Sequence, residues 1–375
     1  MTTRRSRVVQ ACLALTLGVG TALAPAQPAH ADRIRDLQWH LEFLNVAAAH
    51  RISQGDDVTV AVIDTGVDAR HPDLAGAVLP GVDLVGDRGN GHTDLSGHGT
   101  AMAGLIAARG RGNGRGVLGI APRAMVFPVR DRRLSIAYDR ISAGIEWAIS
   151  QGADVICIAS TGRPSAELQT AIAAAIRADI IVVAAVGNRP ESSNVGWPAA
   201  YPGVVAAAGV DRNGNHAEVS VTGPEVILAA PAVEIVSTDA VGGTGYSRGT
   251  GTSGATAIIA GAAALVRARF PDLSAAEVVH RLTATAIDKG PPGRDEQYGY
   301  GVIDLVAALT ADVPPMPTPS ASPESTSPPA VALPPLFEPQ EPRPRTGGIF
   351  LVVGITLLAV AVTGVVLSAR AKRQG

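Results

Sequence analysis

Residues 58–68 read VTVAVIDTGVD, a run of β-branched and small apolar residues that ends in an aspartate and a glycine. The run predicts a strand from Val58 to Ile63 that is buried on both faces, and Gly66 allows a sharp turn after it. Similar runs predict four further strands, at 125–129, 154–158, 180–186 and 204–209. Helical spacing of apolar residues marks 134–151 and 167–177. This alternation predicts an α/β fold with a mostly parallel sheet covered by helices on both faces.

Asp64 follows the first predicted strand directly. In parallel sheets, ligand sites lie beyond the carboxyl ends of the strands, where the N-termini of helices also gather. An Asp-Thr-Gly motif also occurs in aspartic proteases, but these need two carboxylates that share a proton, and the chain has one such motif. On its own, Asp64 is equally well explained as a residue that stabilises a turn.

His98 lies in the segment DLSGHGTAMAGLIAARG, residues 94–110, between two glycines and before apolar residues at helical spacing. The segment predicts a helix that begins at or near His98. The positive end of the helix dipole favours a neutral imidazole, as a general base requires. A metal site formed by His92, Asp94 and His98 is the alternative, but their spacing matches no helical pair of metal ligands.

Two further segments place polar side chains at the same predicted edge. The apolar run IIVVAAVGN, residues 180–188, ends in Asn188, whose amide can donate to a developing oxyanion. In GTSGATAIIAG, residues 251–261, Ser253 precedes an Ala-rich segment that predicts a buried helix over 254–267. The helix dipole favours a nucleophilic hydroxyl there, and the backbone N–H of Ser253 can join Asn188 as an oxyanion donor. Each fragment has an ordinary structural explanation, but together they indicate one catalytic site.

The two ends of the chain have compositions unlike a globular domain. Arg4, Arg5 and Arg7 precede an apolar run and the small-residue site Ala29-His30-Ala31, which predicts a secretory signal peptide rather than a first membrane anchor. Residues 349–367 carry no charge, and as a helix they span roughly 28 Å, enough to cross a bilayer. A basic cluster follows at 370–373, so the preceding chain is expected outside the cytoplasm. A buried core helix is the alternative, but Pro and Gly residues isolate the segment.

Charge and cysteine content exclude other classes. The 31 basic and 33 acidic residues nearly balance, so the chain has no net positive charge that would attract nucleic acid. Of the two cysteines, Cys12 lies in the predicted signal peptide, and Cys157 lies in an apolar strand where burial makes a thiol unreactive. The domain is therefore expected to be stable without disulfides. A polysaccharide hydrolase is disfavoured because no suitable carboxylate pair is recognisable.

The segments VAVIDTGVD, SGHGTAMAG, AAVGN and GTSGATAIIAG resemble the motifs of the subtilases, the subtilisin-like S8 serine peptidases, over residues 58–309. The order Asp, His, Ser is that of the subtilisin triad. The signal peptide, the Pro-rich segment and the C-terminal apolar helix resemble the mycosins, which are membrane-anchored subtilases of type VII secretion systems. Residues 32–56 match the mycosin N-terminal extension in position. The resemblance implies a three-layer subtilisin-like fold and one C-terminal transmembrane helix.

The resemblance also implies roles for individual residues. Ser253 attacks the scissile carbonyl, His98 takes and returns the proton, Asp64 orients His98, and Asn188 donates to the oxyanion. The substrate backbone is expected to lie beside residues Ile158, Ala159, Ser160, Thr161 and Gly162.

The sequence departs from the subtilase pattern at several places. Gly254 replaces a bulkier residue and Ala257 replaces a proline, which changes how the helix begins and indicates reduced activity. The substrate segment differs from the usual Ser-Leu-Gly-Gly, so specificity does not carry over, and the disulfides usual in mycosins are missing. Residues 108–119, ARGRGNGRGVLG, carry three arginines and no carboxylate where many subtilases bind calcium. No metal and no cofactor are expected.

These inferences predict a serine endopeptidase that is anchored in the cell membrane by a single C-terminal helix. Its catalytic domain is expected on the extracytoplasmic side, acting on exported proteins together with type VII secretion components. The alternative is a weakly active or inactive subtilase that serves as a scaffold in a secretion complex. The predicted organisation is a signal peptide, an N-terminal extension, a peptidase domain, a Pro-rich linker, a transmembrane helix and a cytoplasmic tail, at residues 1–31, 32–56, 57–311, 312–348, 349–368 and 369–375.

Overall fold

A computed structural model describes residues 33–86, 89–132, 140–241 and 245–316. Its centre is a seven-stranded sheet in which every pair of neighbours is parallel, in the order β2-β3-β1-β4-β5-β6-β7. The strands are β1 (Thr59–Asp64), β2 (Val82–Asp83), β3 (Met125–Arg130), β4 (Val155–Ile158), β5 (Ile181–Ala185), β6 (Val205–Val210) and β7 (Val226–Pro231). The predicted parallel α/β fold is therefore confirmed. The sequence patterns did not identify β2, which has only two residues, or β7.

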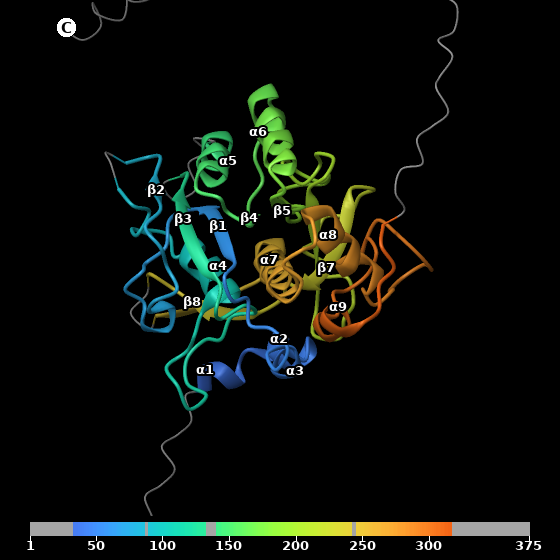
Figure 1. Ribbon diagram of the computed structural model, residues 1–375, viewed down its shortest axis with the longest axis horizontal. Coiled ribbons are helices and arrows are strands. Elements are labelled where there is room, and N and C mark those ends of the chain that lie inside the picture. Colours follow the sequence, from blue (N-terminus) through green and yellow to red (C-terminus); the bar gives the residue numbers. More distant parts are fainter. Residues whose placement is uncertain (1–32, 87–88, 133–139, 242–244, 317–375) are drawn as a thin grey trace, which may run out of the picture. The chain divides into compact units, whose positions relative to one another are not determined.

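Alternate residues of each strand supply two separate cores. In β1, Val60 and Val62 belong to the core on one face of the sheet, and Ala61 and Ile63 belong to the core on the other. Figure 1 shows α4 and α7 on the first face and α5 and α6 on the second. These helices are α4 (His98–Ala107), α5 (Ile141–Ser150), α6 (Ala166–Arg177) and α7 (Thr252–Arg269). Burial on both faces explains why the strands read as continuous apolar runs.

Helix α7 is the central helix of the first face, and its small residues set how closely it packs. Ala257 is fully buried. A Cβ on Gly261 would lie 2.7 Å from the Cβ of Ile120, so only glycine allows this close approach. The buried, Ala-rich helix predicted over 254–267 is confirmed, and it begins two residues earlier, at Thr252.

The N-terminal segment contains three short helices, and residues beside these helices bond it to the rest of the domain. The Gln38 side chain accepts from the Leu118 N–H over 2.8 Å and donates to the Leu118 carbonyl over 3.1 Å. The Ser53 hydroxyl donates to the carbonyl of Leu265 over 2.8 Å. The remaining elements are α1 (Arg33–Asp36), α2 (Trp39–Phe43), α3 (Val46–Ala49), the 3₁₀ helix η1 (Pro72–Leu74), β8 (Ile235–Thr238), β9 (Tyr246–Gly249), α8 (Ala275–Ala284) and α9 (Leu305–Thr310).

Within the described ranges, every helix is either too short or too polar to serve as a membrane span. The predicted signal peptide, most of the predicted linker and the predicted transmembrane segment 349–368 lie outside the described residues.

Candidate active site

Asp64 and His98 form an ion pair at the carboxyl edge of the sheet, in which the carboxylate is buried and the imidazole side chain is 38% exposed. Asp64 is the last residue of β1 and is fully buried, and His98 is the first residue of α4. The His98 Nδ1 lies 2.8 Å from Oδ1 and 2.9 Å from Oδ2 of Asp64. The Thr65 N–H also donates to Oδ1 over 2.7 Å. Because Nδ1 faces the carboxylate, Nε2 is the ring nitrogen left to act on a substrate.

The pair shifts the pKa of both partners. Burial raises the pKa of Asp64, but the nearby charges of His98 and Arg132 and the hydrogen bonds from His98 and Thr65 outweigh it and lower the pKa to about 2. The Asp64 carboxylate raises the pKa of His98 above its usual value, against the opposing effect of burial. The expectation that the helix dipole keeps the ring neutral is therefore outweighed, because a full negative charge at 2.8 Å acts more strongly than the partial charge of a helix end.

Asp94 holds the elements that carry this pair. Its Oδ1 accepts from the Thr65 hydroxyl and from the N–H groups of Ser96 and Gly97, each over 2.9 Å. Its Oδ2 accepts from the N–H and hydroxyl of Thr100, over 2.9 and 2.7 Å. Asp94 thus caps α4, whose N-cap Gly97 has no side chain, and ties the helix to the turn after β1. This role of Asp94 was not predicted from the sequence, where Asp94 was only a possible metal ligand.

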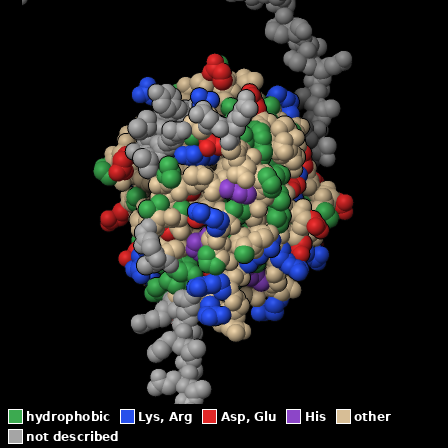
Figure 2. Space-filling view, turned by 90° about the vertical axis from the view of Figure 1, so that its left-hand side faces the viewer, with side chains coloured by type: hydrophobic (Ala, Val, Ile, Leu, Met, Phe, Trp, Pro, Cys, Tyr) green, Lys and Arg blue, Asp and Glu red, His purple; other side chains and the backbone are tan. Residues whose placement is uncertain are grey.

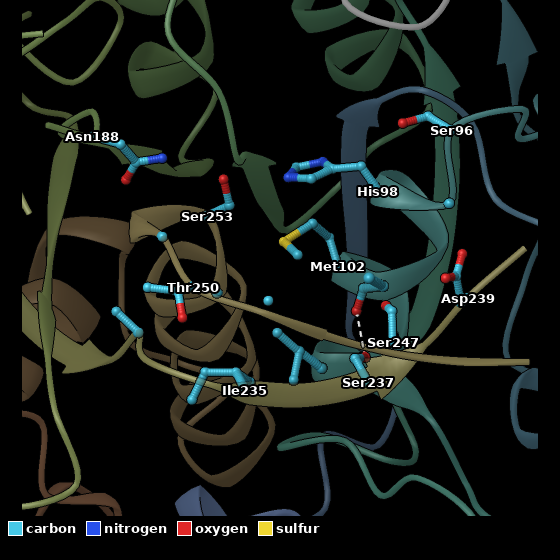
Figure 3. A pocket seen from close by; sticks show the side chains of 17 residues that line it. Ser96, His98, Met102, Asn188, Ile235, Ser237, Asp239, Ser247, Thr250 and Ser253 are labelled. Carbon is cyan, nitrogen blue, oxygen red and sulfur yellow. Dashed lines mark hydrogen bonds between the residues drawn. The ribbon is translucent and has the colours of Figure 1, made fainter. Parts of the chain in front are cut away.

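Ser253 is the second residue of α7, at the same edge of the sheet. Its hydroxyl donates to the carbonyl oxygen of Ala159 over 2.9 Å. Among the described residues, no hydrogen bond joins this hydroxyl to His98. Figure 3 shows the His98 ring and the Ser253 side chain directed into the same space. The hydroxyl must therefore rotate away from Ala159 to reach His98.

Asn188 lies on the other side of Ser253 in this view (Figure 3). Its Oδ1 accepts from the backbone N–H of Thr252 over 2.9 Å and lies 3.1 Å from the Thr252 hydroxyl. With the oxygen held by Thr252, the two N–H groups of the amide are left to face the cleft, as an oxyanion donor requires. This role of Thr252 was not predicted from the sequence, because it depends on contact with a residue 64 positions away.

A cavity of about 440 Å³ brings three of the predicted residues together, since His98, Asn188 and Ser253 all line it (Figure 3). Asp64 does not line the cavity but contacts His98, which does. The segment 158–162 does not line this cavity. Ile158 is fully buried and paired with Ala184, so its side chain does not face the cleft. The Gly162 N–H already donates to the Trp197 carbonyl over 2.6 Å.

The contacts in this region argue against two alternatives, a catalytic cysteine and a metal site. Cys157 is fully buried, and burial together with the charge of Asp64 raises the pKa of its thiol, which makes it a poor nucleophile. The His92 ring contacts the Leu79 carbonyl and the Asn90 side chain, and both Asp94 oxygens serve α4 and Thr65. His92, Asp94 and His98 therefore have separate structural roles and do not converge as metal ligands.

Arginine side chains of the loop 108–119 bind it to the rest of the domain. Arg109 donates to the Pro122 carbonyl over 3.1 Å, and the Arg111 Nε lies 3.1 Å from the carboxylate of Asp73. In Figure 2, Lys and Arg side chains gather on the lower part of the face in view. No group of three or more His, Cys, Asp or Glu side chains suited to a metal ion occurs in the described part of the chain.

A parallel α/β sheet with an Asp–His pair, a serine at the start of a helix and an amide donor at one edge defines the subtilisin-like class of proteins. The Subtilase family model matches residues 55–301, and the chain belongs to this family. The predicted family is thus confirmed.

Within the family, the chain is similar to subtilisins and, over more of its length, to a mycosin. Subtilisin E of Bacillus subtilis strain 168 is 43% identical over 261 residues, which is 68% of this chain and 66% of the relative's own length. Mycosin-1 of Mycobacterium tuberculosis strain H37Rv is 35% identical over 86% of this chain and 83% of its own. The crystal structure of MycP1 from the ESX-1 type VII secretion system is 30% identical, with a TM-score of 0.68, and the match covers 78% of this chain and 90% of that one.

Proposed function

We propose that the protein is a serine endopeptidase, anchored in the cell membrane, that cleaves exported proteins in association with a type VII secretion system. The observation that carries the proposal is the hydrogen-bonded Asp64–His98 pair beside a cavity that His98, Ser253 and Asn188 line. The match to the crystal structure of MycP1 from the ESX-1 type VII secretion system supports the link to secretion.

The arrangement supports an acyl-enzyme mechanism. The Ser253 hydroxyl leaves the Ala159 carbonyl, turns to Nε2 of His98 and attacks the scissile carbonyl carbon while His98 takes its proton. Asp64 stabilises the resulting imidazolium. The oxyanion accepts from the Asn188 amide and from the Ser253 N–H, which has no partner within the helix because it lies in the first turn. His98 then returns the proton to the leaving amine, and water releases the acyl group by the same steps.

Membrane attachment rests on sequence and is part of the proposal. The uncharged segment 349–368 would anchor the domain, and the basic residues after it would stay in the cytoplasm. A chain truncated before residue 346 would test this. We expect the full chain in the membrane fraction after alkaline extraction and the truncated chain in the medium. A truncated chain that stays in the membrane would contradict the proposed anchor.

The test of activity is covalent labelling with a fluorophosphonate probe. Wild type is expected to label, and Ser253→Ala and His98→Ala are expected not to. Circular dichroism of all three proteins controls for folding. If correctly folded wild type does not label, the proposal of an active peptidase fails.

That outcome would favour the second candidate, a subtilase scaffold without activity. One observation favours it: the Ser253 hydroxyl bonds Ala159 and not His98. The retention of Asp64, His98, Asn188 and Ser253 around one site argues for the enzyme, because a scaffold needs none of them.

A further inference from the structure

The cavity beside Ser253 extends well beyond the catalytic groups. Its floor is apolar and is formed by Met102 and Leu105 of α4 and Ile235 of β8. These side chains are only 6, 1 and 4% exposed, so they form the floor of a recess and not an outer surface. Figure 3 shows Met102 between His98 and Ile235. At about 440 Å³, the cavity has the size of sites that enclose a ligand group.

Of the four glycines that line this cavity, two keep it wide, Gly249 of β9 and Gly254 of α7. Neither has a positive φ, so the backbone does not require glycine at either position. A Cβ on Gly254 would lie 3.6 Å from the nearest atom of Ile235 and 3.8 Å from Leu105, which is ordinary contact. A Cβ on Gly249 would meet nothing within 4 Å.

Other glycines of the site have structural reasons that these two lack. Gly97 has a φ of 84°, and a Cβ on Gly99 would lie 2.1 Å from the Gly66 carbonyl oxygen. Glycine inside a helix is also destabilising relative to alanine, by about 0.5–1 kcal/mol. What Gly249 and Gly254 provide is the space that a larger side chain would fill.

The position of the cavity indicates which part of a substrate enters it. The leaving amine receives its proton from His98, so it departs on the side of Ser253 where His98 and α4 lie. His98, Ala101, Met102 and Leu105 line the cavity, whereas residues 159–162, where the acyl side is expected to lie, do not. The side chain that follows the cleaved bond is therefore the one nearest the recess.

We propose that Gly249 and Gly254 open a specificity pocket for a large apolar side chain in the residue directly after the cleaved bond. The pocket rests on the proposed peptidase function and adds a substrate class to it: polypeptides with a residue such as Leu, Met or Phe at that position. The flexible Met102 on its floor lets it accept apolar groups of different shape. Asp239 at its edge disfavours an acidic side chain.

The test is the digestion of a peptide library, prepared from a denatured proteome, with cleavage sites read by mass spectrometry. Wild type is expected to cut before large apolar residues about tenfold more often than before Ala or Gly, a ratio typical of apolar pockets. Gly254→Met fills the recess, and its ratio is expected to fall to about twofold or less. Gly254→Ala is the matched control, since its single methyl leaves the recess open and the ratio high.

Gly249→Leu narrows the same recess from the opposite wall without changing α7, and its ratio is also expected to fall. It keeps the test decisive if Gly254→Met does not fold. Wild type that labels with fluorophosphonate and cuts without this preference overturns the pocket alone, as does an unchanged ratio in folded Gly254→Met or Gly249→Leu. Wild type that neither labels nor cuts overturns the proposed peptidase and the pocket with it.

Discussion

The backbone N–H of Thr252 donates to Oδ1 of Asn188 over 2.9 Å, so the residue before the nucleophile fixes the orientation of the oxyanion donor. The Thr252 hydroxyl, 3.1 Å from the same oxygen, adds a second restraint. The backbone that carries the nucleophile is therefore coupled to the donor, while the Ser253 hydroxyl remains free to rotate. Any distortion at the start of α7 changes both.

Asn188→Ala is expected to lower kcat by about 10²–10³ with little change in KM, because the amide acts mainly on the transition state. That range is known from a subtilisin and is carried over to this relative. Thr252→Val keeps the backbone N–H and removes only the hydroxyl, so its loss should be about tenfold or smaller. Steady-state kinetics on a peptide substrate measure both. A higher KM at unchanged kcat would show that Asn188 only binds substrate.

The activity should fall in acid at a pH above the usual value for histidine. His98 must be neutral to take the Ser253 proton, and the Asp64 carboxylate raises the pKa of His98 above 6.5. kcat/KM is therefore low below that raised pKa and reaches its plateau above it. Asp64→Asn should shift the residual activity to lower pH. If the kcat/KM of wild type falls to half of its plateau only below pH 6.5, the assigned Asp64–His98 pair is contradicted.

Both members of this pair stabilise the fold, but their contributions are lost at opposite ends of the pH range. His98 has a raised pKa, so its contribution is complete below 6.5 and is lost as the pH rises through its folded-state pKa. Asp64 has a pKa of about 2, so its contribution is present above 3.8 and is lost as the pH falls through about 2. Denaturant unfolding of Ser253→Ala, which cannot digest itself, is expected to show both trends. Asp64→Asn in that background should remove them.

The sequence alone placed the main strands and the four catalytic candidates, because each candidate lies at the end of a strand or the start of a helix. Asp64 ends β1, His98 begins α4, and Ser253 is the second residue of α7. Asn188 follows β5 closely. Local patterns and one general rule on parallel sheets were sufficient for these positions.

The parts that the sequence did not predict depend on pairing between distant segments. The β8–β9 hairpin forms one wall of the cavity, but no local pattern relates Ile235 to α4. The bond from Ser253 to Ala159 joins residues 94 positions apart. The capping role of Asp94 was not predicted either. The N-cap residue itself is Gly97, which has no side chain, and the cap comes from Asp94 earlier in the chain.

Asp94→Ala is expected to lower both stability and kcat. The substitution leaves the buried N–H groups of Gly97 and Thr100 without their acceptor, and each such group costs about 1–3 kcal/mol. Asp94→Asn keeps one acceptor oxygen and should lose less. The unfolding midpoint in urea and kcat are the measurements. If Asp94→Ala unfolds at the wild-type midpoint, Asp94 does not cap α4 in solution.

Gly99→Ala and Gly254→Ala should have opposite effects on stability, although both glycines adjoin catalytic candidates. The Cβ of Gly99→Ala would collide with the Gly66 carbonyl oxygen at 2.1 Å, displacing the start of α4 and lowering stability by about 1–3 kcal/mol. Gly254→Ala meets only ordinary contacts and should gain about 0.5–1 kcal/mol. Urea unfolding compares them. Equal stabilities would contradict the packing described at one of the two sites.

The N-terminal extension should stabilise the domain without controlling access to the site. Gln38 is 2% exposed and satisfies both backbone groups of Leu118, yet none of residues 33–56 lines the cavity beside Ser253. Gln38→Ala leaves those groups unpaired, which should cost about 1–3 kcal/mol and lower Tm by about 2–4 °C for each kcal/mol. Glu42→Ala, on the exposed side of α2, is the control and should leave Tm unchanged. The rate of fluorophosphonate labelling should be the same in both variants and in wild type. Faster labelling of Gln38→Ala would show instead that the extension restrains the catalytic groups, and that its release activates them.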